Sequence, residues 1–470
     1  MIALSLAEIA AATSGRVVLA GDDTPDTLVD GYVDTDSRKI APGDVFVAKP
    51  GEVTDGHNFV GTALEAGAAL ALVEREVDVA ISQIVVADVV VAIAELAREV
   101  VARVRSRGEL RVIGITGSNG KTTTKNMLRR ILEDEGETVA PVASYNNAVG
   151  APLTMLRVRE STKFLICELG ADAPGQIARL AGLVTPDVGV VLMVGLSHAG
   201  GFGGIEHTAR AKRELIEQVR PGGVAVLNAD DHRVAAMADT ARERGLGVRL
   251  FGESADAAVR ATSIAVSASG TDSTLDVDGA QFPLHLRVLG AHHVKNAMAA
   301  LTAAIALGVD PSDAIARLET IDLAERWRMQ VMGSESVRII NDAYNASPDA
   351  MQAALRTLAQ ITGEGERMVA VLGAMSELGE HDVEEHNKIG LLAVRLRIPR
   401  IVVVGREARA LFLSAIAEGS WSDEAVFFET ADEAYDYLKD ELRDGDRVLV
   451  KSSNAAGLRF LGDRLGELFS

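Results

Sequence analysis

The segment Thr116-Gly117-Ser118-Asn119-Gly120-Lys121-Thr122 follows an apolar run, 112–115, and opens into a helical pattern from Thr123 onward. A strand that ends in a glycine-rich turn and feeds a helix directs several backbone N–H groups and the positive end of the helix at one spot. Such a spot holds a polyphosphate, with Lys121 reaching the outer phosphates and the Thr122 hydroxyl on Mg²⁺. The segment predicts an ATP-binding loop whose nucleotide contacts are Gly117, Ser118, Asn119, Gly120, Lys121, Thr122 and Thr123.

The loop departs from the strict spacing of nucleotide-binding loops in one respect. The position five residues before Gly120 is Ile115, and the earlier glycines stand at Gly114 and Gly117 instead. The match is therefore a G-x-x-G-K-T variant, and the alternative interpretation is an ordinary strand-to-helix turn that contains a lysine.

The composition restricts the class of partner. The chain has 470 residues and a net charge of −20, from 47 basic and 67 acidic side chains. Because basic residues form no concentrated run, we expect neither nucleic acid nor an anionic membrane surface as a partner. No apolar segment approaches the ~18 residues of a membrane helix, and the N-terminus lacks the basic start of a secretory signal. Cys167 is the only cysteine, so an intrachain disulfide is impossible, and we expect a cytoplasmic protein without membrane insertion.

Apolar strand-like runs alternate with helical patterns along most of the chain. This alternation predicts an α/β protein with parallel sheets and crossover helices. Between Arg249 and Leu289 the pattern changes to short alternating pieces with Gly and Asp turns, which predicts a small antiparallel appendage. The main expected strands are 112–116, 164–167, 188–194, 224–228, 338–341, 368–372, 401–404 and 447–450.

These changes of pattern, together with a prior of ~150 residues per domain, divide the chain into three expected domains. Residues 1–87 form a small α/β N-terminal domain. Residues 88–323 form a central P-loop-type domain with a parallel sheet and the antiparallel appendage. Residues 324–470 repeat strand and helix four times, as a Rossmann-like C-terminal domain does.

Polar residues follow the strands after the loop. Glu168 ends an apolar strand, and ligand sites in open α/β sheets lie outside the carboxyl ends of strands, so we expect this carboxylate to bind Mg²⁺. The alternative is a solvated glutamate. His198 follows the next strand in a glycine-rich loop, either as a ligand at the same crevice or as a local hydrogen-bonding residue. Chemistry alone favours Lys212 as a surface lysine on a charged helix face.

Two later polar clusters resemble nucleotide and substrate contacts. The segment 290–297 contains His292 and Asn296 and precedes a long apolar helix; the alternative is a helix cap with a polar first turn. The segment 341–348 follows another apolar strand, and Pro348 suits the first position of a helix. Its alternative is a plain turn and cap.

These segments, in this order, resemble the Mur ligases of peptidoglycan synthesis over nearly the whole chain. The family motifs T-G-[ST]-[NS]-G-K-T, N-N-x-x-G-x-P-L, E-x-G and N-A-D appear at 116–122, 146–153, 168–170 and 228–230. Segment 344–348, Tyr-Asn-Ala-Ser-Pro, resembles the Y-N-A-[NS]-P motif of the last ligase in the series. The resemblance implies a monomeric enzyme that uses ATP and Mg²⁺ to join D-Ala-D-Ala to UDP-MurNAc-tripeptide through an acyl phosphate.

The resemblance also implies the roles of individual residues. Lys212 takes the place of a family lysine that is often carbamylated; with Glu168 and His198 it would hold a second Mg²⁺, while Thr122 and Glu168 hold the ion on ATP. The expected catalytic residues are Lys121, His198 and Lys212. Further nucleotide contacts are expected at Asn228, His292, Asn296, Arg328 and Asp342. Substrate contacts are expected at Ser37, Arg38, Lys49, Asp55, Gly56, His57, Asn146, Asn147, Tyr344, Asn345 and Ser347.

The chain departs from the family pattern at several positions. Ala374 stands where an acidic residue is common, and Trp327 replaces the usual glycine before Arg328. Ser452 and Asn454 replace the glycine and the arginine of a K-G-S-R segment. These departures leave the reaction class intact and concern the contacts to D-Ala-D-Ala.

Two rival interpretations stay open. One is another ligase of the superfamily, either folate-polyglutamating or an earlier-step Mur ligase. The other is a nucleotide-dependent switch that binds ATP without joining substrates. The main interpretation requires that Lys121, Glu168 and His198 share one cavity.

Overall fold

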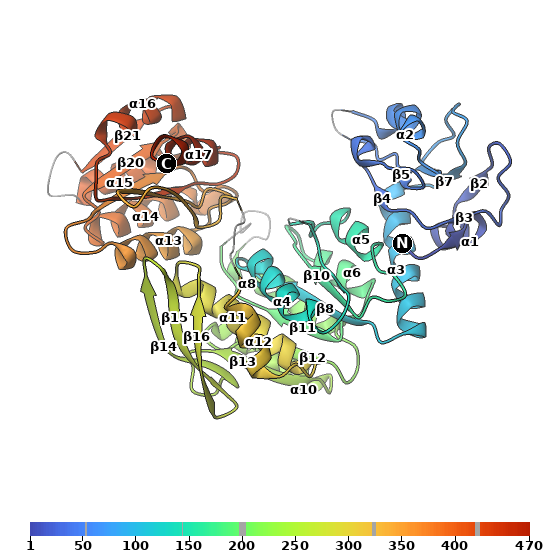
Figure 1. Ribbon diagram of the computed structural model, residues 1–470, viewed down its shortest axis with the longest axis horizontal. Coiled ribbons are helices and arrows are strands. Elements are labelled where there is room, and N and C mark those ends of the chain that lie inside the picture. The colour runs from blue at the N-terminus through green and yellow to red at the C-terminus, as the bar shows by residue number, and fades with distance from the viewer. Residues whose placement is uncertain (52–53, 143, 197–203, 322–325, 419–423) are drawn as a thin grey trace.

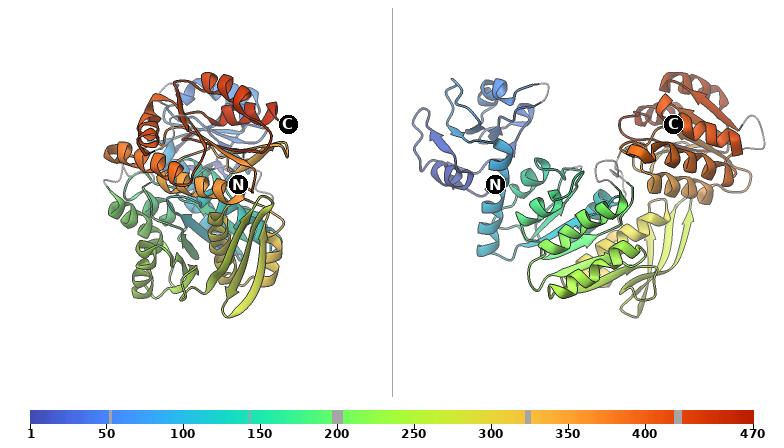
Figure 2. Two further views of the ribbon diagram at one scale, coloured as in Figure 1. Left: turned by 90° about the vertical axis from the view of Figure 1, so that its left-hand side faces the viewer. Right: turned by 180° about the vertical axis from the view of Figure 1, so that it is seen from behind.

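The computed structural model describes residues 1–51, 54–142, 144–196, 204–321, 326–418 and 424–470. These residues form three α/β units in chain order, and the N-terminal and C-terminal units lie on opposite sides of the central one (Figure 1 and Figure 2). The expected α/β fold is confirmed. Of the helices in the described ranges, none combines the length and apolar character that a membrane span requires.

The N-terminal unit contains a small sheet and a separate two-stranded ribbon. Its elements are β1 (Leu4–Ser5), α1 (Leu6–Thr13), β2 (Arg16–Val18), β3 (Leu28–Val29), β4 (Val33–Asp34), η1 (Ser37–Lys39), β5 (Val45–Val47), η2 (Gly56–Phe59), α2 (Val60–Glu65), β6 (Leu70–Val73) and β7 (Gln83–Val85). The five-stranded sheet has the order β2-β7-β6-β5-β4, in which β2 pairs antiparallel and the other neighbours pair parallel. β1 and β3 form the ribbon.

The central unit is built on one nine-stranded sheet. Its elements are α3 (Val89–Arg107), β8 (Arg111–Thr116), α4 (Lys121–Glu133), β9 (Thr138–Val139), α5 (Gly150–Met155), β10 (Phe164–Glu168), α6 (Gln176–Gly182), β11 (Val188–Val191), α8 (Ile205–Gln218), β12 (Val224–Asn228), α9 (His232–Ala235), α10 (Met237–Glu243), β13 (Gly247–Gly252), β14 (Val259–Ser267), β15 (Gly270–Val277), β16 (Ala280–Leu286), α11 (Ala291–Ala306) and α12 (Pro311–Leu318). The strand order is β16-β15-β14-β13-β12-β11-β8-β10-β9. β8, which feeds the glycine-rich loop, pairs parallel with both β10 and β11.

The expected antiparallel strands are present as β14 to β16, and they extend the main sheet because β14 also pairs parallel with β13. One expectation about this sheet needs correction. The strand expected over 188–194 ends at Val191. Leu192 and Met193 leave the sheet there and line a cavity at its edge.

The C-terminal unit contains a six-stranded sheet with the order β17-β18-β22-β19-β20-β21. Its elements are β17 (Gln330–Gly333), β18 (Val337–Asn341), α13 (Pro348–Ile361), β19 (Arg367–Leu372), η3 (Gly379–His381), α14 (Asp382–Arg395), β20 (Arg400–Val404), η4 (Arg406–Ala408), α15 (Arg409–Glu418), β21 (Ala425–Phe428), α16 (Ala431–Glu441), β22 (Asp446–Lys451) and α17 (Arg459–Leu468). β17 pairs antiparallel with β18, and the other neighbouring strands are parallel. The predicted boundary at 323 falls outside the described residues.

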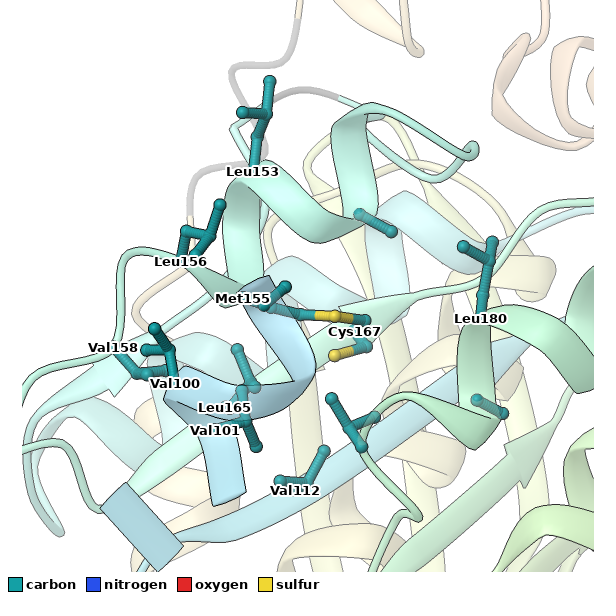
Figure 3. Packing of buried hydrophobic residues seen from close by; sticks show 14 of the residues in the cluster. Val100, Val101, Val112, Leu153, Met155, Leu156, Val158, Leu165, Cys167 and Leu180 are labelled. Atoms are coloured by element: carbon teal, nitrogen blue, oxygen red, sulfur yellow. The ribbon is translucent and has the colours of Figure 1, made fainter. Parts of the chain in front are cut away.

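A continuous apolar core joins the N-terminal unit to the central one. Helix α3 buries Val100 and Val101 in the same cluster as Leu165 and Cys167 of β10 (Figure 3). The cluster also includes residues of the N-terminal strands β5, β6 and β7. The middle strands of this sheet, β8, β10, β11 and β12, are mostly apolar and buried, as expected of parallel strands that are covered on both faces. Cys167 packs in this cluster as a small apolar group, and burial raises the pKa of its thiol to about 12.

Asp187, just before β11, is a buried carboxylate that ties several elements together. It accepts a hydrogen bond of 2.7 Å from the backbone N–H of Val112 and forms ion pairs with Arg105, Arg111 and Arg220 at 3.2, 3.4 and 2.8 Å. One carboxylate thus anchors β8, the end of α3 and the turn after α8.

We expect Asp187→Ala to lower the free energy of unfolding by about 3 kcal/mol, since it leaves a buried N–H without an acceptor and three guanidinium groups without their anion. Chemical denaturation followed by circular dichroism measures this change. Asp239→Ala, which removes an exposed ion pair with Arg242, is the control and should change the free energy by less than about 1 kcal/mol. Equal free energies of unfolding for Asp187→Ala and Asp239→Ala would contradict the stabilising role of Asp187.

Candidate active site

The glycine-rich loop connects β8 to α4 in the conformation that an anion site needs. Gly120 adopts a φ of +85°, which favours glycine, and a Cβ there would lie 2.3 Å from Oδ1 of Asn296 and displace that amide. Helix α4 begins at Lys121 without a side-chain cap, which leaves its first N–H groups facing the loop. Nζ of Lys121 curls back to donate to the carbonyl of Gly117 at 2.7 Å. Burial lowers the pKa of Lys121.

Glu168 stands at the carboxyl end of β10, next to the loop. It is only 1% exposed, so the alternative of a solvated glutamate is wrong. Its Oε1 accepts from Oγ1 of Thr122 at 3.2 Å and from Nδ2 of Asn146 at 2.8 Å. Its Oε2 is buried and has no hydrogen-bond partner among the described residues. A buried carboxylate oxygen beside a threonine hydroxyl is the donor set that a hard cation prefers.

The C-terminal unit closes the opposite side of this site. Nη2 of Arg328 lies 3.4 Å from Oγ1 of Thr122, and the guanidinium stacks over the Tyr344 ring at 4.1 Å from its centroid. The Tyr344 hydroxyl is 2.7 Å from Oγ of Ser144. Oγ of Ser347 donates to Oδ1 of Asn119 at 3.1 Å. Polar groups at the carboxyl ends of two separate sheets therefore meet.

Asp342 and the residues around it are fixed by their own contacts. Nζ of Lys451, the last residue of β22, lies 2.5 Å from Oδ2 of Asp342 and donates to the carbonyl of Asn345 at 3.1 Å. Oδ1 of Asp342 accepts from the backbone N–H of Met329 at 3.0 Å. This lysine follows an expected strand, so the rule of carboxyl strand ends could have found it.

A histidine pair opens α11 on the same cavity. The rings of His292 and His293 lie 4.1 Å apart. Burial lowers the pKa of His292 to about 4 and that of His293 well below its usual value, so both are neutral near pH 7. Neither ring nitrogen of His293 has a hydrogen-bond partner among the described residues. Sequence reasoning singled out His292 and missed its neighbour.

These groups line one cavity of about 310 Å³. Lys121 and Glu168 both line it, which confirms that part of the spatial prediction, whereas His198 lies outside the described residues. The other predicted residues that line it are Ser118, Asn119, Gly120, Thr122, Thr123, Asn146, Asn228, His292, Asn296, Arg328, Asp342, Tyr344, Asn345 and Ser347. Lining residues that were not predicted include Ser144, His293, Lys295, Asp349 and Lys451.

Lys212 lies on α8 and is 4% exposed, so the alternative of a surface lysine is wrong. Burial, and secondarily the charge of Lys121, lower its pKa to about 7. Lys212 is not among the residues that line the cavity. Asn147 is also absent from the lining; its Oδ1 accepts from the backbone N–H groups of Val149 at 3.1 Å and Gly150 at 2.9 Å.

The predicted substrate residues of the N-terminal unit do not line this cavity either. Nδ1 of His57 lies 2.6 Å from Asp55, and its Nε2 accepts from the N–H of Glu74 at 2.9 Å, so both ring nitrogens serve the local fold. Gly56 packs against the Lys49 backbone, where a Cβ would come within 2.6 Å. Ser37 and Arg38 lie in η1.

We expect Glu168→Gln to raise the thermal midpoint of the ligand-free protein by roughly 2–4 °C, because it removes a buried negative charge with one unpartnered oxygen. Differential scanning fluorimetry measures this shift. Glu214→Gln is the matched control, since both Glu214 oxygens accept backbone N–H groups, from Gly175 at 2.7 Å and Ala178 at 2.9 Å, and its midpoint should fall. A lower midpoint for Glu168→Gln would show that the carboxylate is already compensated.

Comparison with known proteins identifies the family. Three family models match the chain: "Mur ligase family, catalytic domain" at 32–111, "Mur ligase middle domain" at 115–304 and "Mur ligase, glutamate ligase domain" at 327–454. The UDP-N-acetylmuramoyl-tripeptide–D-alanyl-D-alanine ligase of Mycobacterium tuberculosis is 41% identical over 99% of this chain and 98% of that protein. The Bacillus subtilis ligase of the same name is 32% identical over 97% of each chain.

Solved structures agree with these sequence matches. MurF from Acinetobacter baumannii superposes with a TM-score of 0.88 at 32% identity, covering 99% of each chain. The MurF ligase of Thermotoga maritima, solved in complex with ADP, gives a TM-score of 0.79 at 28% identity over 94% of this chain and 97% of that one. The chain belongs to the Mur ligase family and is a ligase of the MurF type.

Proposed function

We propose that this enzyme uses ATP to join D-Ala-D-Ala to UDP-MurNAc-tripeptide, giving UDP-MurNAc-pentapeptide in the cytoplasm, and that it works as a monomer. The names of the relatives supply the two substrates, and the ADP bound to the Thermotoga maritima neighbour supplies the nucleotide class. The observation that carries the proposal is the single cavity in which Lys121, Thr122 and Glu168 of the central unit face Arg328 and Tyr344 of the C-terminal unit.

The loop and the start of α4 would hold the phosphates of ATP. Free N–H groups at the helix start and the ammonium of Lys121 offer fixed positive charge, and Arg328 adds a guanidinium from the opposite side. Lys121 now contacts loop carbonyls, which a phosphate oxygen would replace as its partner. We assign the remaining nucleotide contacts to Asn228, His292, Asn296 and Asp342, with the loop residues Gly117, Ser118, Asn119, Gly120 and Thr123.

The donor set at Glu168 fits Mg²⁺. Among the described residues, no group of three or more His, Cys, Asp and Glu side chains gathers, so an ion here would be completed by phosphate oxygens. Thr122 and Glu168 would hold one ion, and Glu168, His198 and Lys212 a second. Bound Mg²⁺ would neutralise charge on the phosphates. The burial and lowered pKa of Lys212 support its reaction, as a neutral amine, with CO₂ to form a carbamate that offers oxygen ligands.

The proposed reaction has two steps. The terminal carboxylate of the tripeptide attacks the γ-phosphorus of ATP, which forms an acyl phosphate and releases ADP. The amine of D-Ala-D-Ala then attacks the acyl carbon, and phosphate and a proton leave. Lys121 and Arg328 would bring the anions together, and closure of the three units would keep water from the acyl phosphate.

Each unit would then bind one substrate. Residues 88–323 would hold ATP, residues 1–87 the UDP-sugar and residues 324–470 the incoming dipeptide. We assign substrate contacts to Ser37, Arg38, Lys49, Asp55, Gly56, His57, Asn146, Asn147, Tyr344, Asn345 and Ser347. Since the His57 ring is buried and fully engaged, its contribution would be to shape the backbone around Asp55 and Gly56.

The test is ligation itself. The protein is incubated with ATP, Mg²⁺, D-Ala-D-Ala and UDP-MurNAc-tripeptide ending in L-Lys or meso-diaminopimelate, and products are weighed by mass spectrometry. We expect a pentapeptide product that needs all components, and Lys121→Ala should reduce turnover by roughly 1,000-fold or more with an unchanged circular dichroism spectrum. Lys439→Ala, which removes an exposed lysine of α16, is the control. Normal product formation by Lys121→Ala, or ATP hydrolysis without ligation by the wild type, would refute the proposal.

The carbamate is tested separately with Lys212→Ala. We expect this variant to be largely inactive and to recover partial activity when short-chain carboxylic acids supply the missing oxygen ligands. The same acids should not rescue Lys121→Ala, because that variant lacks a cation. Full activity of Lys212→Ala without added acid would eliminate the modified lysine from the mechanism.

A further inference from the structure

Arg328 stands between two residues in the left-handed region of backbone conformation. Trp327 has a φ of +65° and Met329 a φ of +48°. This conformation is unfavourable for residues other than glycine, and it persists only where surrounding contacts over-determine it. The position of Trp327, where the family usually has glycine, is therefore held by contacts that compensate for the missing glycine.

Backbone hydrogen bonds fix the chain on both sides of Arg328. The N–H of Trp327 donates to Oε1 of Gln330 at 3.0 Å, and its carbonyl accepts from the N–H of Tyr344 at 3.0 Å. The N–H of Met329 donates to Oδ1 of Asp342 at 3.0 Å. The residues on both sides of Arg328 are therefore held in place by hydrogen bonds from their backbone groups.

The Trp327 side chain is held by α17, and neither Trp327 nor any residue of α17 lines the cavity. Its indole N–H donates to both oxygens of Asp463, at 2.9 and 3.1 Å. The guanidinium groups of Arg326 and Arg459 lie 4.7 and 5.3 Å from its ring centroid, and Phe460 meets it edge-on at 6.0 Å. An aromatic ring between two cations is a favourable arrangement.

Asp463 connects this tryptophan to the sheet. Its side chain is only 13% exposed, and besides the indole it accepts from Nδ2 of Asn341 at 3.1 Å and from Nη2 of Arg326 at 2.8 Å. Asn341 is the last residue of β18, directly before the cavity residue Asp342. One carboxylate on α17 therefore fixes both the strand end and the residue next to Arg328.

We infer that Asp463 and Trp327 are positioning residues that hold Arg328 in place over Thr122. Neither lines the cavity, and they act through the backbone that turns the guanidinium inward while the indole faces α17. The left-handed backbone conformations of Trp327 and Met329 allow the indole and the Arg328 guanidinium to point in different directions. The inference rests on the proposed function, in which Arg328 contacts the phosphates of ATP.

A double-mutant cycle tests the inference. Trp327→Phe keeps an aromatic ring, though a smaller one, and removes the indole N–H. Asp463→Ala removes the acceptor of that N–H, and Asp463→Asn retains one acceptor oxygen. Each is made in the wild type and in Arg328→Ala. The control is Asp432→Ala. It removes an exposed ion pair between Asp432 of α16 and Arg464 of α17, the helix that carries Asp463. Steady-state ligation gives kcat and KM, and calorimetry gives the Kd for ATP.

We expect Trp327→Phe and Asp463→Ala to lower kcat or weaken ATP binding by roughly tenfold, with KM for D-Ala-D-Ala within about twofold of the wild-type value. In the Arg328→Ala background the same substitutions should change kcat and the Kd for ATP by less than about twofold, because the arginine that they position is absent. Asp463→Asn should regain most of the loss, and Asp432→Ala should resemble the wild type. If Asp463→Ala does not fold, the cycle is measured with Trp327→Phe alone, with and without Arg328→Ala.

Two results would overturn the inference: wild-type kcat and Kd in Trp327→Phe and Asp463→Ala, or an equal loss with and without Arg328. Failure of the proposed function looks different, because the wild type itself would then form no pentapeptide. In that case the cycle on the Kd for ATP still decides whether Asp463 acts through Arg328.

Discussion

The cavity depends on a buried carboxylate that is only half satisfied. Glu168 receives two hydrogen bonds on one oxygen and none from the described residues on the other. Such a group is unfavourable in the folded chain, and the apolar sheet around it must supply the free energy that keeps it in place. Lys121 is desolvated at the same edge. Glu168 and Lys121 therefore lower the stability of the ligand-free fold, and a ligand with complementary charge would raise it again.

The arrangement of strands explains why these groups meet. β10, β8 and β11 run parallel side by side, so Glu168, the loop after Thr116 and the segment after Val191 leave the sheet at one edge. β18 and β22 do the same for Asp342 and Lys451 in the C-terminal unit. Both units contribute to the polar lining, the central unit the larger share, and neither would form the cavity alone.

Much of this could be predicted from the sequence because apolar runs mark buried parallel strands and polar residues mark their ends. That rule located Glu168 and the segment 341–348 without any structure, whereas Asn228 and the role of Asp342 came from the family resemblance. It could not establish that Lys212 is buried, since an amphipathic helix pattern does not reveal which neighbour covers a charged position. It also missed His293 and Ser144, because their roles arise from contacts between segments far apart in the sequence. The extent of β11 was overestimated, since Leu192 and Met193 are apolar to line a cavity and not to continue a strand.

The two outer units are attached to the centre in different ways. Helix α3 is embedded in an apolar core that continues into the N-terminal sheet, whereas the central and C-terminal units meet through hydrogen bonds such as Ser347 to Asn119 and through a smaller apolar contact, in which Leu289 and Val266 pack on the C-terminal core. Separating an apolar core exposes it to water, while a hydrogen bond can be exchanged for one to solvent at small net cost. Fewer buried apolar groups join the central unit to the C-terminal unit than to the N-terminal one, so we expect the C-terminal interface to separate at lower cost in free energy than the core around α3.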